Sequence, residues 1–143
     1  MSKLMAIVDA IRAVRKLDDK EMKEAGRTYG LSPVEARILI YLYNHPYETT
    51  AQDIADGRSI PKGMVSAGVD SLVGKGYLTR STDSEDRRKI HLIFTEKGRA
   101  LAIELRMYTE KLFQIIFRGF SSDEIETLLS YMSRLYENAE ENL

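Results

Sequence analysis

The polar stretch from Thr82 to Lys89 contains the residues of this sequence best suited to contact a polyanion, because acids alternate there with bases and Asp86 precedes Arg87 and Arg88. An arginine can enter the minor groove of duplex DNA, where narrow A·T segments concentrate negative potential. Asp86 could orient such an arginine through a forked hydrogen bond. We favour Arg88 slightly over Arg87, because residues i and i+2 of an extended ribbon share a face. The alternative is a solvated turn whose charges pair with one another and add little stability.

Residues for catalysis or metal binding are scarce. The sequence has no cysteine, which excludes disulfides and thiolate zinc sites, and its two histidines lie in unrelated settings. No nucleophile–base pair and no glycine-rich phosphate loop after a strand can be identified. We therefore predict a protein that is not an enzyme and uses no metal or cofactor. We expect His91 to be a surface residue and His45 to interact with free carbonyls at a helix end.

The composition and charge are those of an ordinary globular domain with a basic middle. The chain has 143 residues, of which 43% are hydrophobic and 30% charged, with a net charge of −1. Seven bases and four acids lie between Arg58 and Ile90, whereas Ser121 to Leu143 holds six acids and one base. Such a middle segment can bind a polyanion although the whole chain is not basic. No apolar run could span a membrane and the start does not read as a secretory signal, so we expect one cytoplasmic domain over residues 1–143.

The elements that position these residues can be predicted from apolar periodicity and capping motifs. Apolar residues between Leu4 and Val14 recur at helical spacing and predict a first helix. The charged segment from Lys16 to Lys23 leads us to expect that the far end of this helix is the more exposed one. Ser32, followed by Pro33 and Glu35, predicts a capping box at the start of the second helix.

Two further helices are predicted before the polar stretch. Thr49 to Gln52 matches a second capping box and predicts a short helix that ends at Gly57. Pro61 suits the start of the next helix, which the apolar spacing extends to Val73.

Strands are predicted on both sides of the polar stretch, over Tyr77 to Ser81 and Ile90 to Phe94. Thr95 caps a long helix, and Ser121 begins a third capping box before the last helix. We therefore predict a mainly α fold with a small β-ribbon, in which residues 32–95 form a winged helix-turn-helix. The second helix of such a lobe fits the major groove of DNA.

The residues that we expect this recognition helix to present to base edges and phosphates are Lys62, Met64, Ser66, Ala67 and Asp70.

Three residues in or close to the recognition helix allow more than one interpretation each. Lys75 and Arg80 could contact DNA phosphates, or they could be solvated cations. For Lys75 the sequence supports the two interpretations about equally. Gly68 costs helix stability relative to alanine. It indicates a close approach of the helix to the DNA backbone or to a packed neighbour, or it reflects drift at a position that merely varies.

The segment from Leu78 to Gly98 resembles the wing of the multiple-antibiotic-resistance regulator (MarR) family. The shared pattern is an acidic residue, then Asp-Arg-Arg at Asp86 to Arg88, an apolar strand, and Thr-x-x-Gly from Thr95 to Gly98. The resemblance implies a homodimeric, sequence-specific transcription regulator of double-stranded DNA that acts on a palindromic operator, with repression as the expected mode. Residues 1–28 and 96–143 would then form the dimerisation helices.

The resemblance also implies a small aromatic or amphipathic effector between the dimer region and the DNA-binding lobe. The candidate pocket residues are Arg12, Tyr29 and Tyr108, although core and dimer packing would explain each aromatic residue equally well. Arg15 and Arg37 are further cations that could meet an acidic ligand. The alternative function is a helical dimer that holds a partner protein without binding DNA.

Overall fold

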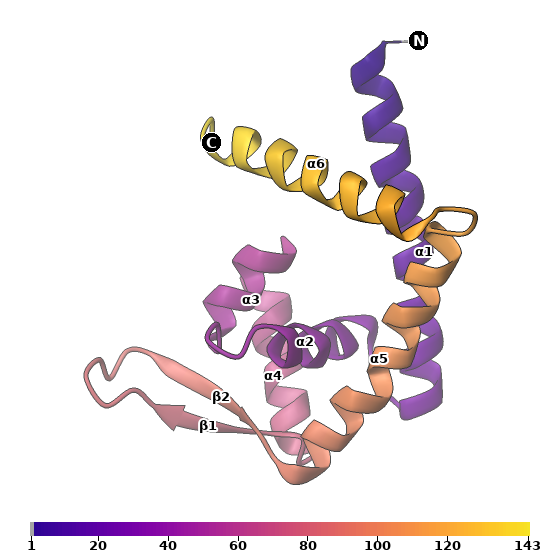
Figure 1. Ribbon diagram of the computed structural model, residues 1–143. Coiled ribbons are helices and arrows are strands. Elements are labelled where there is room, and N and C mark those ends of the chain that lie inside the picture. Colours follow the sequence, from indigo (N-terminus) through magenta and orange to yellow (C-terminus); the bar gives the residue numbers. More distant parts are fainter. Residues whose placement is uncertain (1) are drawn as a thin grey trace. The chain divides into compact units, whose positions relative to one another are not determined.

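The computed structural model describes residues 2–143 and contains two compact units, Met1–Leu112 and Phe113–Leu143. The elements are α1 (Lys3–Tyr29), α2 (Pro33–Asn44), α3 (Ala51–Arg58), α4 (Lys62–Gly74), β1 (Leu78–Thr82), β2 (Ile90–Phe94), α5 (Glu96–Ile116) and α6 (Ser122–Glu140) (Figure 1). The predicted mainly α fold with a small ribbon is therefore confirmed.

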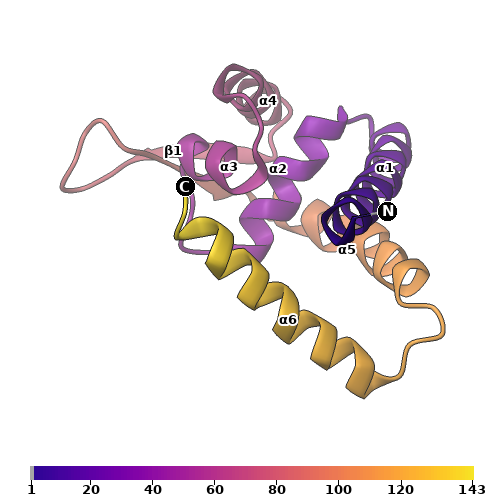
Figure 2. The same cartoon turned by 90° about the horizontal axis from the view of Figure 1, so that it is seen from above.

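Helices α2, α3 and α4 form a cluster from which the β1–β2 ribbon extends, as two perpendicular views show (Figure 1 and Figure 2). The strands pair antiparallel from Leu78 opposite Phe94 to Thr82 opposite Ile90. Strand β1 begins and ends one residue later than predicted. Only Leu78 of β1 and Leu92 of β2 are buried. The ribbon is thus anchored by its base, and its tip is free to reach a ligand outside the lobe.

The core of the first unit joins every helix of that unit to the base of the ribbon. Its most deeply buried large side chains are Met22 of α1, Ile38 and Leu39 of α2, Ile54 of α3, Val65 and Leu72 of α4, Leu78 of β1 and Leu105 of α5.

Within residues 2–143, capping boxes set the starts of three helices. Ser32 and Glu35 form the predicted capping box of α2, and Ser121 and Glu124 form that of α6. The box of α3 uses Thr50 and Asp53, one residue later than predicted. The Thr50 hydroxyl accepts from the Asp53 amide, and Asp53 Oδ2 accepts from the Thr50 amide, so the Thr49 side chain is not used by the cap.

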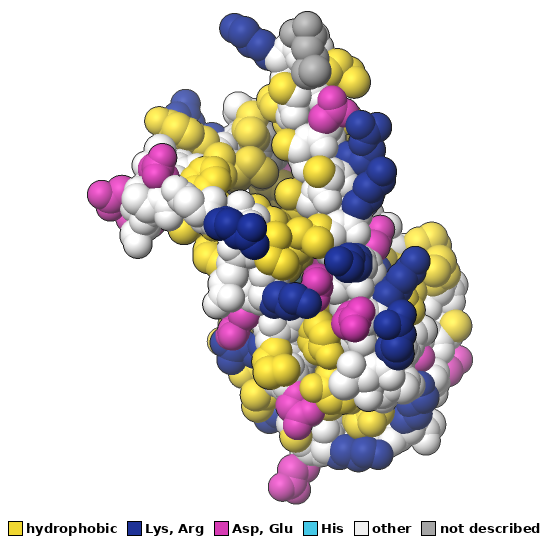
Figure 3. Space-filling model, turned by 90° about the vertical axis from the view of Figure 1, so that its right-hand side faces the viewer, with side chains coloured by type: hydrophobic (Ala, Val, Ile, Leu, Met, Phe, Trp, Pro, Cys, Tyr) yellow, Lys and Arg dark blue, Asp and Glu magenta, His cyan; other side chains and the backbone are white. Residues whose placement is uncertain are grey.

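The expected exposure of α1 is wrong. Its charged C-terminal half contains the buried Glu21, Met22 and Ala25, whereas the apolar side chains between Leu4 and Val14 are 40% to 67% exposed. The second half of α1 packs against α2, so Glu21, Met22 and Ala25 face the core, whereas Lys16, Lys20 and Lys23 are exposed. Figure 3 shows hydrophobic side chains exposed along the N-terminal half of the helix.

The start of α5 explains the Thr-x-x-Gly pattern. The Thr95 hydroxyl accepts a hydrogen bond from the Gly98 amide and donates to the Gly76 carbonyl at 2.7 Å. A Cβ on Gly98 would collide with the backbone carbonyl of Tyr77. Threonine therefore ties α5 to the base of the ribbon, and glycine allows the two backbones to meet.

The second unit consists of the end of α5 and helix α6. No residue of α6 is buried, yet Leu128, Leu129, Met132 and Leu135 recur at helical spacing. An apolar stripe of this kind is typical of a helix that packs against a partner.

Candidate nucleic-acid interface and ligand cavity

Helix α4 presents its predicted recognition residues to solvent. Its apolar residues Val65, Val69 and Leu72 are buried against the other helices of the lobe. The other side of the helix is exposed and carries Lys62, Met64, Ser66, Ala67 and Asp70. These side chains are thus available to a ligand outside the lobe.

Gly68 faces the protein core and not the exposed side of α4. A Cβ at this position would lie 2.7 Å from Ile38 Cδ1 and 3.3 Å from Val34 Cγ1, both of α2. Of the interpretations that the sequence allowed, the packed neighbour is therefore the one that the structure supports. The glycine lets α4 cross close to α2.

The ammonium group of Lys75 forms hydrogen bonds within the protein. Its ammonium group donates to Glu35 Oε2 at 2.8 Å and to the Gly30 carbonyl at 3.0 Å. Glu35 is buried and also accepts from the Ser71 hydroxyl. A buried carboxylate requires a paired cation, so Lys75 has a structural role in the lobe, and a phosphate contact of its 38% exposed side chain stays a prediction.

Burial raises the pKa of Glu35, but hydrogen bonds from Lys75 and Ser32 outweigh this effect and lower the pKa below its ordinary value. Glu35 is therefore charged at neutral pH. Glu35 links the start of α2 to the end of α4, and Lys75 extends this link to Gly30 at the end of α1.

Arg80 of β1 forms an ion pair with Asp70 of α4. The pair neutralises the single acid on the exposed side of α4, which would otherwise repel phosphates. It also ties the first strand of the ribbon to the recognition helix.

The loop between the strands is organised around Asp83 and Asp86. Asp83 Oδ1 lies 2.7 Å from His91 Nε2, and Asp83 Oδ2 accepts from the amides of Glu85 and Asp86. The hydrogen bond with His91, followed by those with the two amides, lowers the pKa of Asp83 to about 2.

Arg88 contacts Asp86, as the i to i+2 spacing suggested. Asp86 Oδ1 accepts from the Arg88 backbone amide at 3.0 Å and from Arg88 Nε at 3.4 Å. One oxygen thus receives both bonds, instead of the forked pair of bonds expected. The Arg88 side chain remains 93% exposed, whereas no ion pair joins Arg87 to another described residue.

His91 lies at the surface, with 34% of its side chain exposed, but both of its ring nitrogens have partners. The ring is half-buried, and its Nδ1 lies 2.7 Å from the Thr49 hydroxyl while Nε2 contacts Asp83. The strand places His91 beside the connection between α2 and α3, which the alternation of apolar residues in one strand did not indicate. His45 does contact a carbonyl at a helix end, that of Tyr41 at 2.9 Å.

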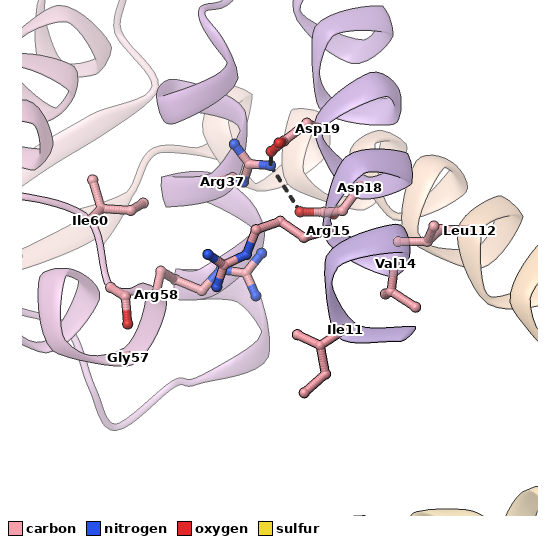
Figure 4. A pocket seen from close by; sticks show the side chains of 11 residues that line it. Ile11, Val14, Arg15, Asp18, Asp19, Arg37, Gly57, Arg58, Ile60 and Leu112 are labelled. Atoms are coloured by element: carbon pink, nitrogen blue, oxygen red, sulfur yellow. Dashed lines mark hydrogen bonds and ion pairs between the residues drawn. The ribbon is translucent and has the colours of Figure 1, made fainter. Parts of the chain in front are cut away.

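A cavity of about 590 Å³ lies in the first unit between α1, α2, the end of α3 and α5 (Figure 4). Three arginines line it: Arg15, Arg37 and Arg58. Arg37 is bound to Asp18 at 2.9 Å and to Asp19 at 2.6 Å. Arg15 and Arg58 extend into the cavity from different walls, and neither forms an ion pair within residues 2–143.

The predicted pocket residues Arg12, Tyr29 and Tyr108 do not line this cavity. Arg12 pairs with Asp9 on the exposed side of α1, and Tyr29 packs edge-on against Tyr108, whose hydroxyl donates to Thr28. The two tyrosines therefore belong to the packing of α1 against α5.

The spacing of residues in α1 indicates which of its side chains face the cavity. Ile11, Val14, Arg15 and Asp18 follow the i, i+3, i+4, i+7 pattern of one helix face, and Arg12 lies off that face. Arg58 could not be found in this way, because only the fold brings the end of α3 opposite α1.

No group of three or more metal-binding side chains occurs in the part of the chain that the structure describes. Over the same residues, none of the helices has the length and apolar character needed to cross a membrane.

Comparisons with known proteins agree with this geometry. The family model described as "MarR family" matches residues 29–89, from the end of α1 to the tip of the ribbon. The HTH-type transcriptional regulator YwhA of Bacillus subtilis (strain 168) is 24% identical over 116 residues, which is 81% of this chain and 83% of YwhA.

Two solved structures show the same fold over nearly the whole chain. A MarR transcriptional regulator from Methanosarcina mazei Go1 has a TM-score of 0.83 at 22% identity, covering 97% of this chain and 99% of its own. A MarR mutant from E. coli, solved with operator DNA, has a TM-score of 0.70 at 18% identity and covers 93% of this chain and 95% of its own. These similarities establish the winged helix-turn-helix fold.

Proposed function

We propose that this chain is a member of the MarR family, whose model matches residues 29–89, and that it is a sequence-specific regulator of transcription that binds double-stranded DNA. The observation that carries the proposal is the pairing of two exposed features on one lobe. Helix α4 turns its polar side to solvent, and the ribbon beside it presents Arg88, 93% exposed, next to Asp86. A helix of this kind fits the major groove while the wing reaches the neighbouring minor groove.

Selection from a pool of random duplexes tests the proposal. We expect enrichment of a palindrome whose half-sites lie about one helical turn apart, roughly 34–36 Å. A pool that shows no enrichment after several rounds would contradict the proposal.

The composition of α4 bears on how specificity arises. Ala67 lies on the exposed side of α4 but is too short for a bidentate base contact, the Ser71 hydroxyl is bound to Glu35, and Asp70 is paired with Arg80. We expect the selected sites to be defined by A·T content and groove shape as much as by direct base contacts. Strongly preferred guanines throughout the major groove would contradict this expectation.

We propose that the active form is a homodimer. The exposed apolar residues of α1 and the apolar stripe of α6 are each too large to be left in water by a stable monomer. A second copy of the chain would cover both. Two lobes would then meet the two halves of a palindrome.

We further propose that the cavity binds a small acidic effector, and that the protein acts as a repressor that this effector releases from DNA. Arg15 and Arg58 supply two cations without partners among the described residues, and Ile11, Val14 and Ile60 supply apolar walls. Such a site suits a carboxylate on a flat apolar body.

The position of the cavity gives a route to the DNA-binding face. Residues 57–60 line the cavity, and α4 begins at Lys62. A ligand that shifts the end of α3 would therefore shift the recognition helix. The ligand changes DNA affinity only if it binds more tightly to the protein with the shifted recognition helix than to the protein with the unshifted one. A coupling free energy of about 1–3 kcal/mol would weaken DNA binding about 5–150-fold.

Titration of salicylate into the free protein and into its complex with a selected duplex tests the effector. We expect binding that weakens in Arg15→Gln and in Arg58→Gln but not in Arg12→Gln, whose exposed guanidinium lies outside the cavity. Equal affinity of salicylate for free and DNA-bound protein would contradict a releasing effector, and the DNA-binding proposal would remain intact.

A further inference from the structure

The tip of the ribbon is connected to the helical lobe by a continuous series of hydrogen bonds. The Thr49 hydroxyl lies 2.7 Å from His91 Nδ1, and His91 Nε2 lies 2.7 Å from Asp83 Oδ1. Asp83 Oδ2 then accepts from the Asp86 amide at 2.9 Å. Asp86 in turn contacts Arg88. The series, which we call the wing relay, thus runs from the α2–α3 connection to the exposed arginine.

The chemistry of the groups fixes the direction of these bonds. The ionised Asp83 carboxylate only accepts, so His91 Nε2 carries a proton and donates to it. In the neutral ring Nδ1 is then an acceptor, and the Thr49 hydroxyl donates to it. When the ring is protonated, Nδ1 donates and the hydroxyl accepts, so both bonds of His91 are satisfied in either charge state.

The lobe end of the relay is rigid. Thr49 immediately precedes the Thr50 cap of α3, and its carbonyl accepts from the Leu92 amide at 2.8 Å. Thr49 therefore holds β2 by its backbone and His91 by its side chain. Leu92 is itself buried, so the two anchors lie at the base of the ribbon.

The tip end has no comparable support. The loop backbone is closed by the bond from the Asp83 amide to the Lys89 carbonyl. Between these residues, Asp83 Oδ2 binds the Glu85 and Asp86 amides, and Asp86 holds the exposed Arg88. A loop that is ordered before it meets DNA avoids the entropy cost of being ordered on binding.

We propose that His91 is a positioning residue for the wing, which acts through Asp83 and Asp86 to present Arg88 to DNA, and that Thr49 fixes His91 to the helical lobe. This inference rests on the proposed DNA-binding function. It assigns a role to a half-buried histidine and to a threonine that contact no DNA themselves.

A double-mutant cycle measures whether His91 acts through Arg88. The probe is a duplex selected by the wild-type protein, and the variants are His91→Ala, Arg88→Ala and the double substitution. We expect His91→Ala to weaken binding about two- to tenfold, the effect of a lost hydrogen bond. In the Arg88→Ala background it should have no further effect. Ser81→Ala, which removes an exposed hydroxyl opposite His91 in the strand register, is the control and should bind as tightly as wild type.

Thr49→Val serves as a second, nearly isosteric variant in case His91→Ala does not fold. It should reproduce the loss, whereas Thr49→Ser, which keeps the hydroxyl, should restore binding. Hydrogen exchange of the Glu85 and Asp86 amides in the free protein gives a readout without DNA. We expect faster exchange in His91→Ala and in Thr49→Val but not in Ser81→Ala.

The outcomes separate the inference from its premise. Additive effects of His91→Ala and Arg88→Ala, or unchanged exchange of the two amides, would overturn the positioning role while leaving DNA binding intact. A wild-type protein that binds no duplex would overturn the proposed function, even if the exchange data show that the wing relay orders the loop.

Discussion

Arg87 and Arg88 are neighbours in the sequence, but the structure gives them different surroundings. Asp86 holds the backbone and the side chain of Arg88 with one carboxylate oxygen. The sequence could predict this contact, since i to i+2 residues of a ribbon share a face. It could not predict the contacts of His91, because Thr49 is 42 residues away in the chain and only the fold brings the two together.

The wing arginines should contribute unequally to DNA binding. We expect Arg88→Ala to cost about 1–3 kcal/mol of binding free energy, as the loss of a side chain from a groove should, and Arg87→Ala to cost less. Fluorescence anisotropy with a selected duplex measures both, and circular dichroism should show unchanged helix content. Equal affinity of both variants and wild type would show that the wing does not contact DNA.

The Glu35–Lys75 pair should make stability depend on pH. The pKa of folded Glu35 lies below its ordinary value of 4.5, so its contribution is fully present above pH 4.5 and is lost as the pH falls through the lower folded value. The stability advantage of wild type over Glu35→Gln should therefore shrink below pH 4.5 in thermal unfolding. An advantage that stays constant from pH 7 to pH 3 would contradict this assignment.

Lys75→Met tests the same pair from its other side. It should lower the free energy of unfolding by about 2 kcal/mol. This loss is smaller than that expected for a fully buried ion pair, because the Lys75 ammonium group is partly exposed. Chemical unfolding at neutral pH measures this effect. A stability equal to that of wild type would show that Lys75 is a solvated cation.

At the scale of elements, the helix starts could be predicted best because a cap depends only on residues three positions apart. Ser32 with Glu35 and Ser121 with Glu124 act as predicted, and the box of α3 differs by one residue. Exposure along α1 was predicted wrongly, because a local excess of charge does not reveal which residues between the charges pack against α2. The cavity depends on residues of four elements: the sequence indicated Arg15 and Arg37 as cations for a ligand, but not Arg58, which only the fold brings opposite α1.

The glycines of α4 should respond in opposite ways to alanine. A Cβ at Gly68 would press on the buried Ile38, whereas nothing lies within 4 Å of a Cβ at Gly63. Gly68→Ala should therefore destabilise the protein by about 1–3 kcal/mol as an overpacked site. Gly63→Ala should stabilise it by about 0.5–1 kcal/mol through helix propensity. Chemical unfolding of the two variants measures the difference, and a stabilising Gly68→Ala would contradict the close crossing of α4 and α2.

At the scale of the whole molecule, the exposed apolar faces predict self-association. Sedimentation at micromolar concentration should give about twice the monomer mass of 16.3 kDa. The double substitution Leu4→Glu and Val8→Glu, which charges one face of α1, should abolish the dimer, whereas Lys16→Glu on the same helix should not. A wild-type protein that is folded and monomeric would contradict the dimer.

The central claim is that the lobe binds the DNA polyanion, although the chain as a whole has a net charge of −1. Its most direct test is the salt dependence of binding to a selected duplex, measured by fluorescence anisotropy with an unrelated duplex of equal length as the control. Counterion release makes affinity fall with salt, so a dimer that neutralises about four to eight phosphates should lose roughly 10²–10⁴-fold in affinity between about 50 and 200 mM salt. The selected duplex should remain the tighter ligand throughout. Absence of binding at low salt, or an affinity that does not change with salt, would contradict the account and would favour a module that holds a partner protein.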